Sequence, residues 1–353
     1  NPGKKPDKGK PLNLSIDSKL QSLIEDLFEN KKGAAICMIP QSGEILASIS
    51  APDYDLNSFA GPVPKDLWDN WNSDTERPLI NRVLQGLYPP GSTFKLIASA
   101  LAIENDVINH SFTVNCKGVY KFGDRDFHCW NTLGHGEINL DKAIRFSCNI
   151  FFYNLIQKLS FDDWESIVKD FKFGVKTNID LLGEQRGLIP NRTYMNKKYG
   201  RYGWAEGNLL TFVIGQGDIL VTPIQVAQMM SIIATRGNTK SPHLLYNYQS
   251  VDLKIDLKPT TWDFLQRVTW EVVNTNDGTG KAAKIDGADV HVKTGTSQNP
   301  HGDDHSWFAG YLVKEGIPVL SLAVLVEHGG KGSVEAASIS HKIFKYAKKN
   351  ISL

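Results

Sequence analysis

A serine and a lysine lie three residues apart at the start of an apolar segment, Ser92 and Lys95 in Ser92-Thr93-Phe94-Lys95. Residues at this spacing share one face of a helix. A serine at a helix N-terminus lies near free backbone N–H groups, which stabilise developing negative charge, and a lysine one turn later is placed to take its proton. The pair predicts a serine nucleophile with a lysine base. The alternative is a plain helix cap beside a solvated lysine, and the motif alone is too short to exclude it.

Two further motifs change this balance. Ser147-Cys148-Asn149 precedes an apolar helical segment, and Lys293-Thr294-Gly295-Thr296 ends a predicted strand. A strand that ends in a glycine turn explains Gly295, but it does not explain a lysine and two threonines beside it. Ser-x-x-Lys, Ser-x-Asn and Lys-Thr-Gly, in this order, are the motifs of the active-site serine penicillin-recognising enzymes. The three together predict acyl transfer through a serine.

Three of the four cysteines fall in one stretch with a histidine. Cys116, Cys129, His135 and Cys148 are separated by 12, 5 and 12 residues, so no C-x-x-C pair is present. From spacing alone, we favour buried thiols or a Cys116–Cys129 disulfide. The fourth, Cys37, is interpreted as a small core residue of a predicted strand.

Composition restricts the class of protein. The 353 residues carry 39 Lys+Arg against 38 Asp+Glu, a net charge of +1, and 41% are hydrophobic, which is typical of a globular enzyme. A near-neutral chain lacks the field that non-specific nucleic-acid binding needs. The longest apolar runs are far shorter than the roughly 20 residues of a membrane span. Residues 1–13 are expected to be a linker, and a start without Met or a signal pattern is interpreted as a processing boundary.

The elements that position these residues come from both ends of the chain. Helical periodicity marks 18–32 and 334–350, and strand patterns mark 34–39, 44–50, 289–294, 306–313 and 319–328. Residues 92–236 are mostly helical in pattern, with loops around 116–137 and 191–207. We therefore expect a mixed α/β (α+β) fold. A five-stranded antiparallel sheet with flanking helices (14–91 and 237–353) and an all-helical subdomain (92–236) would enclose a catalytic cleft.

Segments outside the three motifs resemble class B penicillin-binding proteins. The resemblance covers the chain from Leu14 to the C-terminal helix and is greatest to the penicillin-binding protein 2 group, the transpeptidases of cell elongation. It implies the penicilloyl-serine-transferase fold, that of serine β-lactamases, for residues 14–353. The segments that carry it are 50–57, 81–91, Gly134-His135-Gly136, Gly215-Gln216-Gly217, Thr222-Pro223-Ile224-Gln225 and 304–311.

The resemblance also implies roles for the motif residues. Ser92 would attack the D-Ala-D-Ala carbonyl of a peptidoglycan stem peptide, with Lys95 as base, and an amine of a neighbouring peptide would resolve the acyl-enzyme. Lys95 needs a pKa well below about 10.4 for this, and the charge of Lys293 would help to lower it. Ser147 would relay the proton, Asn149 would hold the substrate amide, Lys293, Thr294, Gly295 and Thr296 would bind the carboxylate, and the N–H groups of Ser92 and Thr296 would form the oxyanion hole.

A metal and partners are implied in the same way. Some members of the penicillin-binding protein 2 group bind zinc beside the active site, which suggests a closed structural site of Cys116, Cys129, His135 and Cys148. Cys116 is the weakest member, with His128, Asp124 and Asp126 as substitutes. The chemistry itself needs no cofactor. Expected partners are stem peptides, β-lactams and elongation-complex proteins, including a glycosyltransferase that docks on an N-terminal region. The expected location is the periplasmic face of the bacterial inner membrane, with an N-terminal anchor outside this chain.

Other interpretations remain open at this stage. A septal class B transpeptidase, a β-lactam sensor domain and a serine β-lactamase all share the motifs. Two glycine-rich segments, 278–281 and 329–333, lack part of the phosphate-loop pattern and are interpreted as turns. His301, Asp303, Asp304 and His305 form either a second metal cluster or, as we favour, a solvated loop that borders the substrate cleft.

Overall fold

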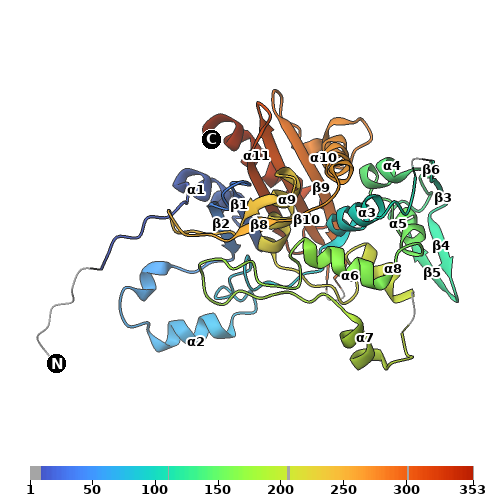
Figure 1. The fold of residues 1–353 in the computed structure, drawn as a ribbon. Helices are drawn as coiled ribbons and strands as arrows, with labels where there is room; N and C mark the ends of the chain where they lie inside the picture. The colour runs from blue at the N-terminus through green and yellow to red at the C-terminus, as the bar shows by residue number, and fades with distance from the viewer. Residues whose placement is uncertain (1–8, 110, 205–206, 300–301, 353) are drawn as a thin grey trace, which may run out of the picture.

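The computed structural model describes residues 9–109, 111–204, 207–299 and 302–352. Its centre is an antiparallel sheet in which the two N-terminal strands pair with the three C-terminal ones, in the order β2-β1-β11-β10-β9 (Figure 1). The predicted five-stranded sheet is therefore confirmed. The strands are β1 (Gly33–Met38), β2 (Ile45–Ala51), β9 (Asp289–Ser297), β10 (His305–Lys314) and β11 (Ile317–Val326).

Helices cover both faces of this sheet. Ser321 of β11 contacts Ser231 of α9 (Pro223–Ala234), with 2.6 Å between the hydroxyls. Gly310 of β10 faces Phe344 of α11 (Glu335–Asn350), and its register partner is the next residue of β11, Leu322. Because successive strand residues point to opposite faces, α9 and α11 lie on opposite sides of the sheet. Helix α1 (Ser18–Leu27) packs beside α11.

Helix α9 lies within the region that was expected to form the helical subdomain, yet it packs against the sheet. It contacts β1, β10 and β11, and every one of its residues is buried. Apart from Gln225, Gln228 and Ser231, its residues are apolar, and a helix buried on all sides is typical of a central position in the core. Helix α9 is therefore part of the sheet's core, and none of its residues lines the described cleft.

The region from 92 to 236 is less purely helical than the sequence predicts. Two small antiparallel pairs lie in the expected loop 116–137, and a helix, α7 (Arg192–Tyr199), lies in the expected loop 191–207. Strands of three or four residues are too short to show an alternating pattern. The pairs are β3 (Val114–Cys116) with β6 (Gly136–Ile138) and β4 (Val119–Phe122) with β5 (Arg125–His128).

Helices α3 and α5 lie near these pairs in Figure 1, and they begin at the motif residues Lys95 and Asn149. The other elements are η2 (Gly91–Phe94), α3 (Lys95–Glu104), α4 (Leu140–Arg145), α5 (Asn149–Ile156), α6 (Phe161–Asp170), α8 (Gly207–Val213), β7 (Asn238–Lys240), β8 (Asp252–Lys254), α10 (Pro259–Asn274) and η3 (Lys281–Ala283). After β2, the chain makes an excursion through η1 (Leu56–Phe59) and α2 (Lys65–Ser73), which extends away from the sheet in Figure 1. No helix in the described ranges is long and apolar enough to cross a bilayer.

Candidate active site

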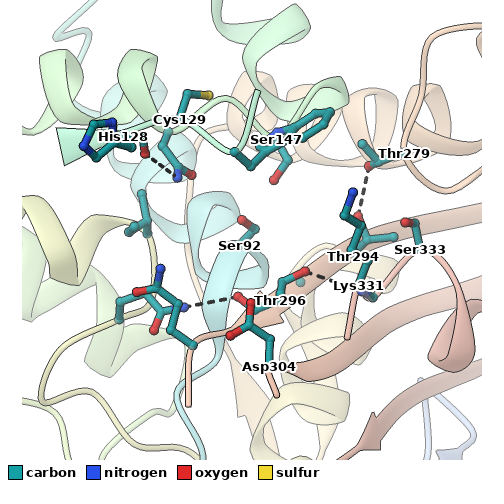
Figure 2. Close-up of a pocket in the computed structure, with 17 residues that line it drawn as sticks. Ser92, His128, Cys129, Ser147, Thr279, Thr294, Thr296, Asp304, Lys331 and Ser333 are labelled. Atoms are coloured by element: carbon teal, nitrogen blue, oxygen red, sulfur yellow. Dashed lines mark hydrogen bonds between the residues drawn. The ribbon is translucent and has the colours of Figure 1, made fainter. Parts of the chain in front are cut away.

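A cleft of about 320 Å³ lies between the β9 edge of the sheet and the helical side, and Ser92 stands at its centre (Figure 2). Its walls contain residues of all three predicted motifs. They are Ser92, His128, Cys129, Trp130, Ser147, Asn149, Ile214, Gln216, Thr279, Thr294, Gly295, Thr296, Gln298, Asp304, Lys331, Gly332 and Ser333.

The backbone before Ser92 is pressed against β9. Gly91 has φ +57°, and a Cβ there would lie 2.6 Å from the carbonyl oxygen of Thr296, so only glycine fits. The carbonyl of Pro89 accepts hydrogen bonds from the Ser297 hydroxyl and from the Trp307 indole. The hydroxyl of Ser92 itself makes no hydrogen bond with the described residues. The nucleophile candidate is thus held through its backbone, with its oxygen exposed to the cleft.

Two buried lysines meet at the hydroxyl of Ser147. Lys95 Nζ lies 3.3 Å from Ser147 Oγ and donates at 2.7 Å to both the Ser147 carbonyl and Asn149 Oδ1. Lys293 Nζ donates to the same hydroxyl at 3.0 Å and to the carbonyl of Thr294 at 3.0 Å. Ser147 has φ +53°, a strained conformation for a non-glycine residue. The fold therefore brings the three sequence motifs together.

Burial changes the proton affinity of both lysines. It lowers the pKa of Lys95 from 10.5 to about 8, although the nearby thiols Cys148 and Cys129 act in the opposite direction. The pKa of Lys293 is lowered well below its ordinary value by burial and then by the charge of Lys95. Two ammonium groups this close to one hydroxyl disfavour each other. The arrangement favours a neutral amine on at least one of them near neutral pH.

The open edge of β9 faces the cleft. The side-chain amide of Gln216 donates to the carbonyl of Thr296 at 3.1 Å, so this carbonyl points away from β10. In an antiparallel strand, the N–H and C=O of one residue point to the same side, and the Thr296 N–H therefore also faces the cleft. The hydroxyl of Thr294 donates to that of Thr279 at 2.9 Å. This edge presents both donors and acceptors to a peptide.

The sulfur and imidazole groups of the helical side form one cluster. All four cysteines are free, so the Cys116–Cys129 disulfide is not formed. The ligand atoms of Cys116, Cys129, His135 and Cys148 all lie within 4.8 Å of one another. His135 Nδ1 lies 3.5 Å from the sulfurs of Cys116 and Cys129, and Cys129 Sγ lies 3.9 Å from Cys148 Sγ. His128, Asp124 and Asp126 are not part of this cluster, the one such group in the described chain.

A buried polar network behind the Ser92 loop was not predicted from the sequence. The hydroxyl of Tyr88 donates at 2.6 Å to Oε1 of Glu327, just after β11, and Arg82 Nε donates to the same oxygen at 2.9 Å. Burial raises the pKa of Glu327, but the Tyr88 hydrogen bond and the Arg82 charge outweigh it, and the pKa is lowered. Tyr88 also pairs with Val221 through two backbone hydrogen bonds. The residues come from three segments that lie far apart in the sequence, at 82–88, 221 and 327, so no local pattern indicates their contact.

Several wall residues of the cleft were interpreted as turns. Thr279 and the segment 331–333 belong to the two glycine-rich segments that lack the phosphate-loop pattern. Asp304 lies in the segment expected to border the cleft, and it does line it (Figure 2). His305 instead packs against the rings of Tyr88 and His328. His301 lies outside the described residues.

The chain is similar to known proteins over most of its length. The family model described as "Penicillin binding protein transpeptidase domain" matches residues 33–345. The chain is 33% identical to the peptidoglycan D,D-transpeptidase MrdA of Haemophilus influenzae, over 96% of this chain and 56% of the relative. The chain thus spans about half the length of the curated relatives it matches.

Two solved structures have the same fold and 34% identity, and each aligns with 96% of this chain. One is a penicillin-binding protein 2 of Helicobacter pylori in complex with MreC, with a TM-score of 0.90 over 64% of that chain. The other is a penicillin-binding protein 2 of Pseudomonas aeruginosa in complex with WCK 5153, with a TM-score of 0.87 over 78% of that chain.

Proposed function

The chain belongs to the penicillin-binding protein transpeptidase family, and we propose that it is the catalytic part of a peptidoglycan D,D-transpeptidase of cell elongation. The observation that carries this proposal is the meeting of Lys95 and Lys293 at the Ser147 hydroxyl, at 3.3 and 3.0 Å, behind Ser92. The names of the relatives favour an elongation role over a septal one. They also favour a transpeptidase over a β-lactamase or a sensor.

In the first half-reaction, Ser92 Oγ attacks the carbonyl carbon between the two terminal D-alanines of a stem peptide. Lys95 takes the hydroxyl proton, and the backbone N–H groups of Ser92 and Thr296 stabilise the oxyanion. The C–N bond then breaks, and the leaving amine of D-alanine receives the proton through Ser147. The product is an ester between Ser92 and the shortened peptide.

In the second half-reaction, a free amine of a neighbouring stem peptide attacks the ester carbonyl. Lys95 removes a proton from this amine, a new C–N bond forms, and the C–O bond to Ser92 breaks. The proton passes back to Ser92 Oγ, so the enzyme returns to its starting state and the product is a cross-link. No cofactor is needed for either half.

The contacts of Lys95 support its role as the base. A protonated amine has three donors, and here they face the Ser147 carbonyl, Asn149 Oδ1 and the Ser147 hydroxyl. The neutral amine retains two donors for the two shorter contacts and gains a lone pair. Because the pKa is lowered to about 8, a usable fraction of this neutral form exists at neutral pH.

The open edge of β9 supports peptide binding. A substrate amide N–H would replace the Gln216 amide at the Thr296 carbonyl, adding a strand to the sheet. The terminal carboxylate would be bound by Lys293 with the hydroxyls of Thr294 and Thr296, beside Gly295. Asn149 would hold the amide of the donor peptide from the opposite side.

An exchange assay tests this function. The protein is incubated with a peptide ending in D-Ala-D-Ala and an excess of another D-amino acid, and the products are followed by mass spectrometry. We expect release of D-alanine and a product that carries the new residue, and neither with Ser92→Ala. Hydrolysis of benzylpenicillin without any exchange would instead indicate a β-lactamase.

We further propose that the Cys/His cluster holds a structural zinc ion. With Zn–S near 2.3 Å and Zn–N near 2.0–2.1 Å, a tetrahedral site requires S–S and S–N separations of about 3.8 and 3.6 Å. The observed 3.9 Å between Cys129 and Cys148 and 3.5 Å from His135 Nδ1 fit these values. Bound zinc would supply no chemistry to the reaction. Cys148 would fix the loop that carries Ser147 and Asn149.

We propose that residues 14–353 form the transpeptidase domain, with a sheet subdomain and a helical subdomain on either side of the cleft, and that 1–13 is a linker. We propose stem peptides and β-lactams as ligands, with an elongation-complex partner and a glycosyltransferase that contact other parts of the protein. The MreC complex of the Helicobacter pylori relative supports the first of these protein partners. We propose a location at the periplasmic face of the inner membrane.

A further inference from the structure

Two charged side chains of the cleft, Asp304 and Lys331, have no role in the proposed reaction. Asp304 supplies the only carboxylate among the 17 residues that line the described cleft, and its side chain lies beside Thr296 in Figure 2. Within the described part of the chain, no hydrogen bond or ion pair engages this carboxylate. Lys331 also lines the cleft, but it does not form an ion pair with Asp304. The carboxylate is therefore available to a ligand.

The position of Asp304 is fixed by the backbone around it. Its carbonyl accepts the N–H of Gly330 at 2.8 Å, which ties it to the loop between β11 and α11. The next residue, His305, accepts the N–H of His328 at 3.1 Å through Nδ1, and Ser306 donates to the carbonyl of Lys331 at 3.1 Å. The backbone around Asp304 is thus held against the loop between β11 and α11 without any contribution from the carboxylate. A preorganised charge of this kind is typical of a recognition site.

The register of the sheet indicates which part of a substrate would meet Asp304. Along β9, the carboxylate-binding Thr294 comes first and Thr296, with the oxyanion N–H, comes second. His305 pairs with Ser297, so Asp304 stands just beyond it, near Gln298, on the side away from the carboxylate end. A peptide bound along this edge would place the residue before its D-alanine pair at this point.

We propose that Asp304 binds an ammonium group on the side chain of the donor-peptide residue that precedes the D-alanine pair. This inference rests on the proposed function and assigns a residue of this chain to the free side-chain amine at that position of the donor peptide. The contact is a charge-assisted hydrogen bond between a carboxylate and an ammonium group. The nearby Lys331 charge weakens the attraction, and salt screens it.

A matched pair of penicillins tests the inference. Aminohexanoyl penicillin carries a terminal ammonium, and its N-acetyl derivative has the same chain without the charge. The second-order rate constant of acylation is measured for both compounds with the wild type, Asp304→Asn and Lys331→Met. We expect the charged compound to react about tenfold faster with the wild type, a ratio near one for Asp304→Asn, and a larger ratio for Lys331→Met.

Different results would contradict the Asp304 contact and the proposed function. An equal ratio for wild type and Asp304→Asn overturns the role of Asp304, whereas the acetylated compound still reports on the serine. A protein that neither compound acylates contradicts the proposed function, and the Asp304 inference with it. A ratio that stays constant between low and high salt also overturns the charge-based contact.

Discussion

On one side of the cleft, β9 is the edge of a five-stranded sheet whose central strands are covered by α9 and α11. On the other side, Ser147 and Asn149 lie next to four short strands that form separate two-stranded pairs. The first side is positioned by long ladders and a large core. The second combines short helices such as α4 and α5 with these pairs, and two-stranded pairs are marginally stable alone. Side-chain contacts of Ser147 and Asn149 with the two lysines, and the Cys/His cluster around Cys148, also hold this side in place.

Lys95 of α3 holds Ser147 and Asn149 in place, and removing it gives the largest expected effect. Lys95→Ala removes both the base and the contacts to Ser147 and Asn149, and we expect acylation by benzylpenicillin to slow by about 10³-fold. Stopped-flow or quenched mass spectrometry measures the rate. The matched control is Lys345→Ala, an exposed lysine of α11. A loss of less than tenfold would separate Lys95 from the proton transfer.

A substitution in the Cys/His cluster tests whether this cluster holds the helical side of the cleft in place. Cys129→Ala breaks the cluster, and we expect loss of the bound zinc, faster hydrogen exchange in residues 114–149 and about tenfold slower acylation. Cys37→Ala, a buried thiol on β1 outside the cluster, is the control. It should lower the stability through a cavity and leave the zinc content unchanged.

The zinc hypothesis is contradicted if protein purified without chelators contains no zinc by elemental analysis. It is also contradicted if Cys129→Ala and Cys37→Ala give the same exchange pattern.

The sequence predicts the sheet side better than the other. Long alternating or apolar strands such as β10 and β11 have clear patterns, and the three motifs lie where spacing predicts. The short strands β3–β6 have no such pattern, so 116–137 was expected to be a loop. The Tyr88–Glu327 contact joins residues 239 apart, and Gln216 reaches Thr296 from 80 residues away. Such contacts depend on tertiary packing, which no local signal encodes.

The proton affinity of Lys95 predicts a pH profile. Because burial lowers its pKa to about 8, the neutral base predominates above that pH and is lost below it. We expect acylation to rise about tenfold between pH 7 and 9 and then to level off. The rate is measured with benzylpenicillin, whose carboxylate stays ionised over this range. A flat profile would mean that Lys95 is already neutral at pH 7 or is not the base.

The smallest effect is expected from the network behind the Ser92 loop. Tyr88→Phe removes the hydrogen bond to Glu327 but leaves the Arg82 contact. We expect the free energy of unfolding to fall by about 1–2 kcal/mol and acylation to slow about threefold. Chemical denaturation and acylation kinetics measure the two quantities, with Tyr246→Phe, an exposed tyrosine, as the control. An unchanged acylation rate would show that the network serves stability alone.

Intact-mass spectrometry after addition of benzylpenicillin, followed over hours with Ser92→Ala alongside, tests the central claim most directly. We predict one lasting adduct on the wild type, with the added mass on the peptide that contains Ser92, and none on the variant. A lasting adduct that persists in Ser92→Ala would place the nucleophile elsewhere. A transient adduct with accumulating hydrolysed drug would contradict the assignment as a transpeptidase and indicate a β-lactamase.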